Sequence, residues 1–163
     1  MEITVVINDL EKINLIQLRK ECDLAHDNGK ICESLYEKLK NYNGNDAVIW
    51  AYKAMTSFLM ANHVFNPFMK MHYFNEGKKW MNIAISKDEN NLEVRFLRFA
   101  LQVKTPEVLG YNKNIKEDKL FLYQEIKNNK VYDYDLLQRI LKFIKDNKEL
   151  FTDTELKEMK VYE

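Results

Sequence analysis

The sequence contains little glycine, proline or cysteine: four, two and two residues among 163. Few glycines and prolines exclude an architecture of many strands and turns, which needs such residues wherever the chain reverses. Cys22 and Cys32 are too few for a disulfide scaffold, and each is expected to pack as a small apolar residue in a helix. Stability must therefore come from a hydrophobic core, which a chain of this length can form.

Neither sign of charge dominates, and no long apolar run occurs. The 25 basic and 25 acidic residues cancel, whereas proteins that wrap nucleic acid usually carry a basic excess, so nucleic-acid binding is not expected. No stretch approaches the roughly 20 apolar residues that cross a bilayer, so no membrane partner is expected. The N-terminal sequence lacks the basic region of a signal peptide. A cytoplasmic location follows by default, although a chain whose leader had been removed would have the same sequence.

Signatures of catalysis are also absent. The sequence contains no glycine-rich phosphate loop, GxSxG elbow or dinucleotide fingerprint, and no cofactor is expected. Cys22 with His26, and His72 with Glu76, share helical faces, but zinc requires three or four converging ligands and no CxxC or HExxH pattern occurs. His26, His63 and His72 are therefore expected at the surface or half buried, with no metal site.

The residues present favour helices. Hydrophobic residues make up 46% and charged residues 31% of a chain rich in Leu, Lys, Glu, Met and Ala, as in soluble helical proteins. Helices are predicted to start at Asp9 or Asn14, at about Ile31, and at Asp46, Asn66, Leu92, Asn114, Asp133 and Thr152. Asn114 with Glu117, and Thr152 with Glu155, have the spacing of a capping box. Breaks are predicted at Asn28-Gly29, Asn43-Gly44 and Thr105-Pro106. We expect one all-α domain over residues 1–163 with seven or eight helices. Its first eight residues form either an extended segment or a frayed terminus.

One pattern in the centre of the chain resembles the second helix and turn of a tetratricopeptide repeat. It reads Phe74-x-x-Gly77-x-x-x-Met81-x-x-Ala84, followed by Asp88-Glu89-Asn90-Asn91. The small, large and small side chains fit this family, although Glu89 replaces its usual proline and Pro67 interrupts the expected first helix. The resemblance covers about one repeat. It implies antiparallel helical hairpins stacked in a right-handed superhelix, a fold used for binding proteins.

A second block resembles small uncharacterised bacterial helical proteins. It comprises Asn91-x-Glu93-x-Arg95-Phe96-Leu97-Arg98, then Gln102, Pro106, Leu109-Gly110-Tyr111, Ile115, Asp118 and Lys119. Because that family carries no assigned activity, the resemblance supports a helical fold and implies nothing about function.

Arg95, Arg98 and Gln102 form a polar stripe on the predicted helix 92–104, which is apolar on the two faces beside it. Such a helix is packed between neighbours, so the stripe is expected to be partly enclosed. Two interpretations remain open: a binding site for an anion or a carboxylate, or a structural ion-pair network. The candidate partners of the arginines are Glu76, Glu93, Glu117 and Asp118.

Apolar residues are dense between Phe58 and Met81, more than one helix face can bury. They either fill the core between several helices or line a groove that binds a peptide. In the second case Trp80, Phe68 and Tyr73 are the candidate apolar contacts.

Three hypotheses of function follow. The leading one is a non-catalytic module that binds a protein or peptide in a groove around the third to fifth helices, with Arg95, Arg98 and Gln102 for polar recognition. The first alternative is a small-ligand-binding protein or enzyme with an anion pocket at the two arginines, using His63 or His72 as acid or base. The second alternative is a structural homo-oligomer, such as a homodimer, with a self-complementary apolar surface.

Overall fold

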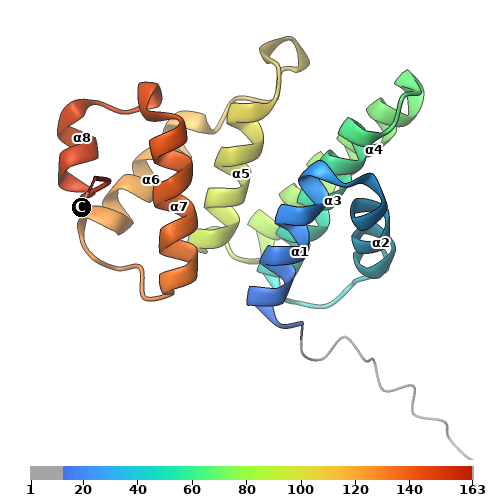
Figure 1. Ribbon diagram of the computed structural model, residues 1–163, viewed down its shortest axis with the longest axis horizontal. Coiled ribbons are helices and arrows are strands. Elements are labelled where there is room, and N and C mark those ends of the chain that lie inside the picture. The colour runs from blue at the N-terminus through green and yellow to red at the C-terminus, as the bar shows by residue number, and fades with distance from the viewer. Residues whose placement is uncertain (1–12, 163) are drawn as a thin grey trace, which may run out of the picture.

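The computed structural model describes residues 13–162 and confirms the all-α fold. Eight α-helices and two short 3-10 helices follow one another, and this range contains no strand (Figure 1). They are α1 (Leu15–Asp27), α2 (Gly29–Leu39), α3 (Ala47–His63), α4 (Pro67–Lys87), α5 (Leu92–Lys104), η1 (Glu107–Leu109), α6 (Ile115–Lys127), α7 (Tyr134–Asp146), η2 (Lys148–Leu150) and α8 (Asp153–Glu158). The prediction for the first eight residues lies outside the described residues.

Polar side chains start the central helices where the sequence predicts. Asp46 Oδ1 accepts hydrogen bonds from two N–H groups in the first turn of α3, at 2.8 and 3.2 Å. Asn66 and Asn91 cap α4 and α5 in the same way. Pro67 occupies the first position of α4, where no N–H donor is needed. Each cap satisfies backbone donors that have no partner within the helix.

The break at Asn28-Gly29 lies where it was predicted, but the second helix begins earlier than the predicted Ile31. Asn28 ends α1 and also caps α2, which begins at Gly29 itself, so no linker separates the two helices. The reciprocal capping box predicted between Thr152 and Glu155 is present and starts α8.

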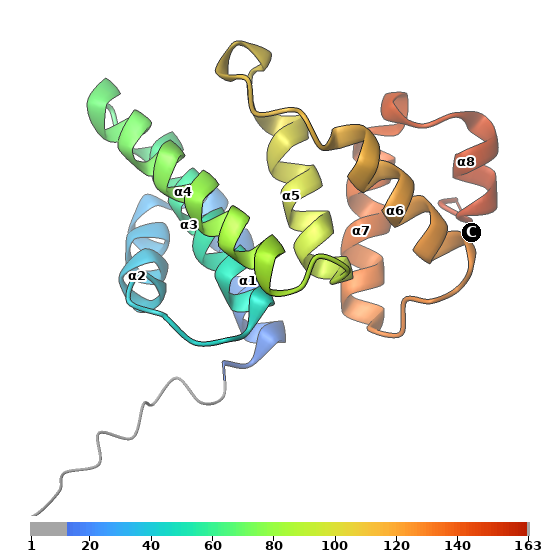
Figure 2. The ribbon, with the colours of Figure 1, turned by 180° about the vertical axis from the view of Figure 1, so that it is seen from behind.

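The two longest helices, α3 and α4, form an antiparallel hairpin (Figures 1 and 2). Gly77 allows their close approach, because a Cβ there would lie 2.6 Å from Cδ2 of Phe58 and 3.2 Å from the carbonyl oxygen of Ala54. Met81 and Ala84 are fully buried. The small–large–small pattern of α4 therefore provides a tight helix–helix contact.

Helix α5 joins the two halves of the chain. It packs against α3 on one side and against α6 and α7 on the other (Figure 2). Its Phe96 and Phe99 rings lie 5.7 and 5.8 Å from the ring of Phe143 on α7. The buried apolar side chains of both halves form one cluster, so the predicted burial of this helix on two sides is confirmed. The superhelical stacking remains a prediction. Within residues 13–162 no helix is long and apolar enough to span a membrane.

Candidate functional site

Arg95 and Arg98 converge on one carboxylate. Asp118 of α6 is fully buried and accepts two hydrogen bonds from Arg98, from Nε and Nη2, both at 2.7 Å. It accepts a third from Arg95 Nε. Arg95 also lies 3.1 Å from Glu117 through Nη2 and donates to the Glu89 carbonyl at 3.1 Å. Burial acts to lower the pKa of Arg98, but the hydrogen bonds and charge of Asp118 outweigh it and raise that pKa.

Gln102 continues the same polar stripe and pairs with Asn114. Its Nε2 donates to Asn114 Oδ1 at 3.1 Å, and its Oε1 accepts from the Asn114 N–H at 3.0 Å. This pair explains why the predicted capping box at Asn114 is wrong: the Asn114 side chain bonds to Gln102 and Glu117 and makes no bond to the backbone of α6. These two hydrogen bonds join the end of α5 to the residue that precedes α6.

Two of the four candidate partners of these arginines lie elsewhere. Glu76 Oε2 accepts hydrogen bonds from the hydroxyls of Tyr36 and Ser57, both at 2.9 Å. Glu93 faces the opposite side of α5, where it binds Arg19. The polar stripe is thus completed by the acidic residues that start α6.

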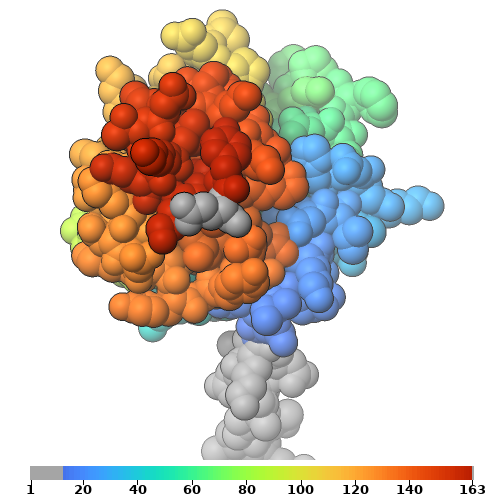
Figure 3. All heavy atoms as spheres, turned by 60° about the vertical axis from the view of Figure 1, so that its left-hand side comes forward, coloured from blue at the N-terminus to red at the C-terminus, as the bar shows by residue number. Residues whose placement is uncertain are grey.

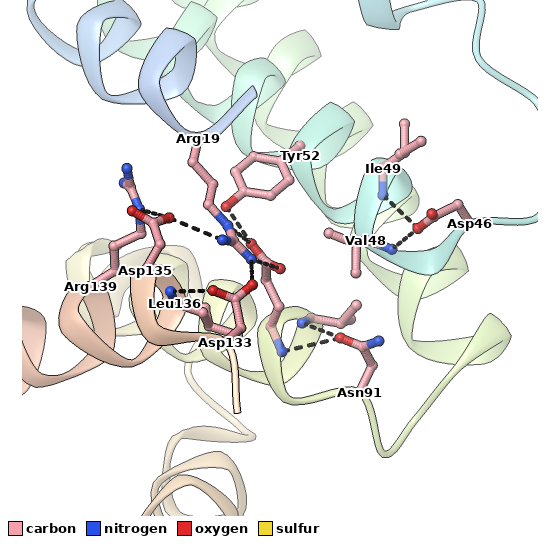
Figure 4. Close-up of polar contacts among 12 residues, drawn as sticks. Arg19, Asp46, Val48, Ile49, Tyr52, Asn91, Asp133, Asp135, Leu136 and Arg139 are labelled. Atoms are coloured by element: carbon pink, nitrogen blue, oxygen red, sulfur yellow. Dashed lines mark hydrogen bonds and ion pairs between the residues drawn. The ribbon is translucent and has the colours of Figure 1, made fainter. Parts of the chain in front are cut away.

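Arg19 is the centre of a second buried network, which the sequence analysis missed (Figure 4). Its side chain is 1% exposed and donates to Glu93 through Nε at 2.8 Å and Nη2 at 2.7 Å. The same group binds Asp133 at 2.8 Å and Asp135 at 3.0 Å. Tyr52 adds a hydrogen bond from its hydroxyl to Glu93 at 2.7 Å. One guanidinium thus ties α1 to α5 and to the start of α7, with α3 joined through Tyr52.

Arg139 extends this network toward the surface. Its Nε donates to Asp135 at 2.9 Å and its Nη1 to Asp23 of α1 at 2.6 Å. Hydrogen bonds from Arg19 hold the pKa of Asp133 below its usual value, and those from Arg139, then Arg19, lower the pKa of Asp135. All these carboxylates are paired with an arginine, so the network links α1 and α5 to α7 and has a structural role.

The three candidate apolar contacts have different environments. Trp80 is buried, with its ring 4.4 Å from Nζ of Lys53 and 6.0 Å from the ring of Tyr36. Tyr73 is half buried and packs edge-on against Tyr36 at 5.3 Å. Phe68, in contrast, is 85% exposed. Among the three, Phe68 alone is largely available to a partner.

Phe68 belongs to a group of exposed apolar residues that we call the apical surface. Its members are Phe65, Phe68, Met69 and Met71 at the turn into α4, and Val108 and Leu109 in η1. Both segments rise at the same end of the molecule, the upper end in Figures 1 and 2. Figure 3 shows them as two separate prominences, green for the α4 end and yellow for η1. The sequence predicts the apolar character of the first segment, but no signal in it indicated the contribution of η1.

An aromatic contact lies beneath the apical surface. The ring of Tyr111 stacks on Phe58 at 5.5 Å and meets Phe74 edge-on at 6.1 Å, which fixes the η1 connection against the α3–α4 hairpin. Gly110, with a φ of 62°, provides the left-handed turn after η1. The hydroxyl of Tyr111 is buried and makes no hydrogen bond of normal length and angle within the described part of the chain, although the Gln102 side chain lies nearby. Burial raises its pKa to about 12.

Burial dominates the environment of both cysteines. Burial raises the pKa of Cys22 to about 12 and that of Cys32 to about 11, so both thiols are protonated near neutral pH. His63 Nε2 lies 2.8 Å from the carbonyl oxygen of Ala25, while His26 is exposed. Among residues 13–162 no three His, Cys, Asp or Glu side chains are grouped as metal ligands would be.

A pocket of about 560 Å³ lies at the opposite end of the fold from α4, between η2 and α8. It is lined by Lys148, Glu149, Phe151, Asp153, Leu156, Lys157, Lys160, Val161 and Tyr162. Lysines, carboxylates and apolar side chains alternate in this lining, so the pocket favours no charge of one sign.

Comparison with known proteins gives no relative: no family model, no curated protein and no solved structure matches this chain.

Proposed function

We propose that the protein is a non-catalytic interaction module that binds a protein or peptide partner through its apical surface. The observation that carries this proposal is the exposure of Phe65, Phe68 and Val108, at 98, 85 and 91%, on two segments at one end of the molecule. Single exposed apolar residues are common, whereas a gathering of large ones is typical of interaction surfaces.

The arginine stripe supports this reading over an anion-binding enzyme. Arg95 and Arg98 already bind the carboxylates of Asp118 and Glu117, so an incoming anion would have to displace a buried carboxylate. Displacement would leave Asp118 unpaired in the protein interior, which is strongly unfavourable.

In this proposal Arg95, Arg98 and Gln102 position the apical surface without touching the partner. They hold the start of α6 against α5, and so fix both ends of the connection that carries Val108. A rigid connection reduces the conformational entropy that binding would otherwise cost.

Affinity capture from the native cell tests the proposal, with wild type compared to Phe68→Ser/Val108→Ser. Both residues are exposed, so the variant should keep the wild-type unfolding temperature while losing its partner. The matched control is Tyr132→Ser/Tyr134→Ser, which removes two exposed aromatics, 91 and 74% exposed, at the start of α7. A partner retained by the control and lost by the apical variant supports the proposal. Equal retention by both contradicts it, and recovery of a second copy of this chain favours the homo-oligomer.

A further inference from the structure

The chain contains two Asn-Gly pairs, and the fold places them in different environments. Asn28-Gly29 lies between α1 and α2, and Asn43-Gly44 lies in the connection between α2 and α3. An asparagine followed by glycine is especially prone to deamidation, because glycine has no side chain to hinder attack by its own backbone nitrogen. Both asparagines are exposed, so water reaches each of them.

Asn28 is held in place as a helix cap. Its Oδ1 accepts hydrogen bonds from the N–H groups of Lys30 and Ile31, at 3.1 and 3.2 Å. The side chain must leave both bonds before its amide carbon can approach the Gly29 nitrogen. A cap of typical strength lowers the population of the free side chain about fivefold. Asn28 is therefore protected by the fold.

Asn43 has no such protection. Within residues 13–162 its side chain makes no hydrogen bond, and the N–H of Gly44 donates none. The nitrogen and the amide carbon therefore meet without first giving up a hydrogen bond. This pair precedes the start of α3, whereas the apical surface lies beyond the end of α3 (Figures 1 and 2). Chemistry at Asn43 is thus independent of the proposed function.

We infer that Asn43 is a site of spontaneous deamidation and isoaspartate formation, and that isoaspartate there loosens the α2–α3 connection. The Gly44 nitrogen bonds to Cγ of Asn43, and the side-chain nitrogen leaves with the displaced proton as ammonia, which forms a cyclic succinimide. Water then breaks one of the two bonds from the Gly44 nitrogen to a carbonyl carbon. Breaking the bond to Cγ gives aspartate, and breaking the bond to the main-chain carbon gives isoaspartate. One water is consumed, one ammonia is released, one carboxylate forms and nothing is oxidised.

The connection has no room for the extra backbone carbon of isoaspartate. The carbonyl oxygen of Tyr42 accepts a hydrogen bond from Lys53 Nζ at 2.8 Å, and that of Gly44 accepts one from Trp50 Nε1 at 2.9 Å. These bonds fix the backbone on both sides of Asn43. A single Cβ on Gly44 would already lie 2.5 Å from the hydroxyl oxygen of Tyr42. A longer backbone must therefore displace at least one of these carbonyl groups.

Both tryptophans of the chain lie beside the same lysine. The rings of Trp50 and Trp80 lie 4.3 and 4.4 Å from Nζ of Lys53, and the sequence contains no other tryptophan. Displacement of the Tyr42 carbonyl removes the hydrogen bond that holds this ammonium, so both cation–π contacts change with it. Intrinsic fluorescence therefore measures the structural consequence of isoaspartate.

Incubation of the purified full chain at neutral pH tests the inference. Mass spectrometry of its peptides locates deamidation, and enzymatic methylation quantifies isoaspartate. In the folded chain Asn43 should react at least about fivefold faster than Asn28, the internal control, because only Asn28 is held as a cap. In urea that unfolds the chain the cap is lost, and the difference should disappear. Tryptophan fluorescence should change in step with isoaspartate at position 43.

Two variants separate the backbone effect from other causes. Asn43→Gln should keep the initial fluorescence over the same time, because its amide carbon lies one bond further from the nitrogen. Asn43→Asp adds the charge without the extra backbone carbon and should also keep the wild-type fluorescence. A rate at Asn43 no higher than that at Asn28 in the folded chain overturns the inference. Isoaspartate at position 43 without a change in fluorescence, or an equal change in either variant, overturns the effect on the connection.

Discussion

Replacement of Arg19 by methionine should destabilise the fold strongly. Methionine keeps much of the apolar stem but removes every hydrogen bond to Glu93, Asp133 and Asp135. The side chains of the two aspartates are 46 and 36% exposed and can be hydrated by water instead. The loss of their bonds to Arg19 should therefore cost little stability. Glu93 is 5% exposed and would retain only Tyr52 as a donor among these residues.

The magnitude therefore depends on Glu93. Leaving one member of a buried ion pair without its partner costs about 3–5 kcal/mol. For a domain of this length, each kcal/mol corresponds to roughly 2–4 °C in Tm, so the variant should unfold about 6–20 °C below wild type. Denaturant unfolding followed by circular dichroism measures the same loss as a change in midpoint, provided that the slope m is unchanged.

Arg139→Met provides the matched control. This arginine belongs to the same network but is 23% exposed, and its partner Asp23 is 62% exposed, so its removal should cost at most about 1 kcal/mol. In Arg19→Met/Glu93→Gln the buried charge is gone, and stability should recover by at least about half of the single-variant loss. The reasoning is refuted if Arg19→Met costs no more than the control, or if the two substitutions are simply additive.

Three further predictions concern other features. Gly77→Ala should lower the unfolding free energy by about 1–2 kcal/mol in denaturant melts, because overlap with Phe58 exceeds the gain in helix propensity; equal or higher stability would contradict the close contact. Tyr111→Phe should raise stability by up to about 1 kcal/mol, since it removes a buried hydroxyl that makes no hydrogen bond of normal geometry among the described residues; a clear loss would show that the hydroxyl bonds to the nearby Gln102 side chain. The hydrogen bond from Arg19 lowers the folded-state pKa of Asp133. The carboxylate therefore makes its full contribution to stability above its unfolded pKa of about 4, and this contribution is lost as the pH falls toward the lower folded-state pKa. Asp133→Asn should therefore show a shallower fall in stability below about pH 4, and an unchanged slope would contradict the ion pair.

Helix positions could be predicted because their signals are local. Asp46, Asn66 and Asn91 each precede an apolar run and cap the helix through bonds to residues two or three positions away. Asn114 carries the same local signal, yet its side chain bonds to Gln102, twelve positions earlier in the chain. A partner brought near by the fold competes with the cap, and spacing alone does not reveal it.

The buried networks could be predicted only in part. The stripe at Arg95 and Arg98 was recognisable because the flanking apolar faces require an enclosed helix. Arg19 lies beside the apolar positions of its own helix, but its partners are 74, 114 and 116 positions away, a distance that periodicity does not bridge. A compositional signal was present, since arginine is rare in this lysine-rich chain. The position of Val108 on the apical surface depends on Tyr111 packing against the α3–α4 hairpin, which is equally non-local.

Arginine and lysine have different tasks in this protein. The four arginines, Arg19, Arg95, Arg98 and Arg139, all bind carboxylates between helices, three of them buried. The planar guanidinium suits this because it binds several oxygens at once and is weakly hydrated. Most lysines stay at the surface, where a strongly hydrated ammonium on a flexible stem can meet a partner at little desolvation cost. The cations that hold the fold together are thus a different set from the hydrated cations of the surface.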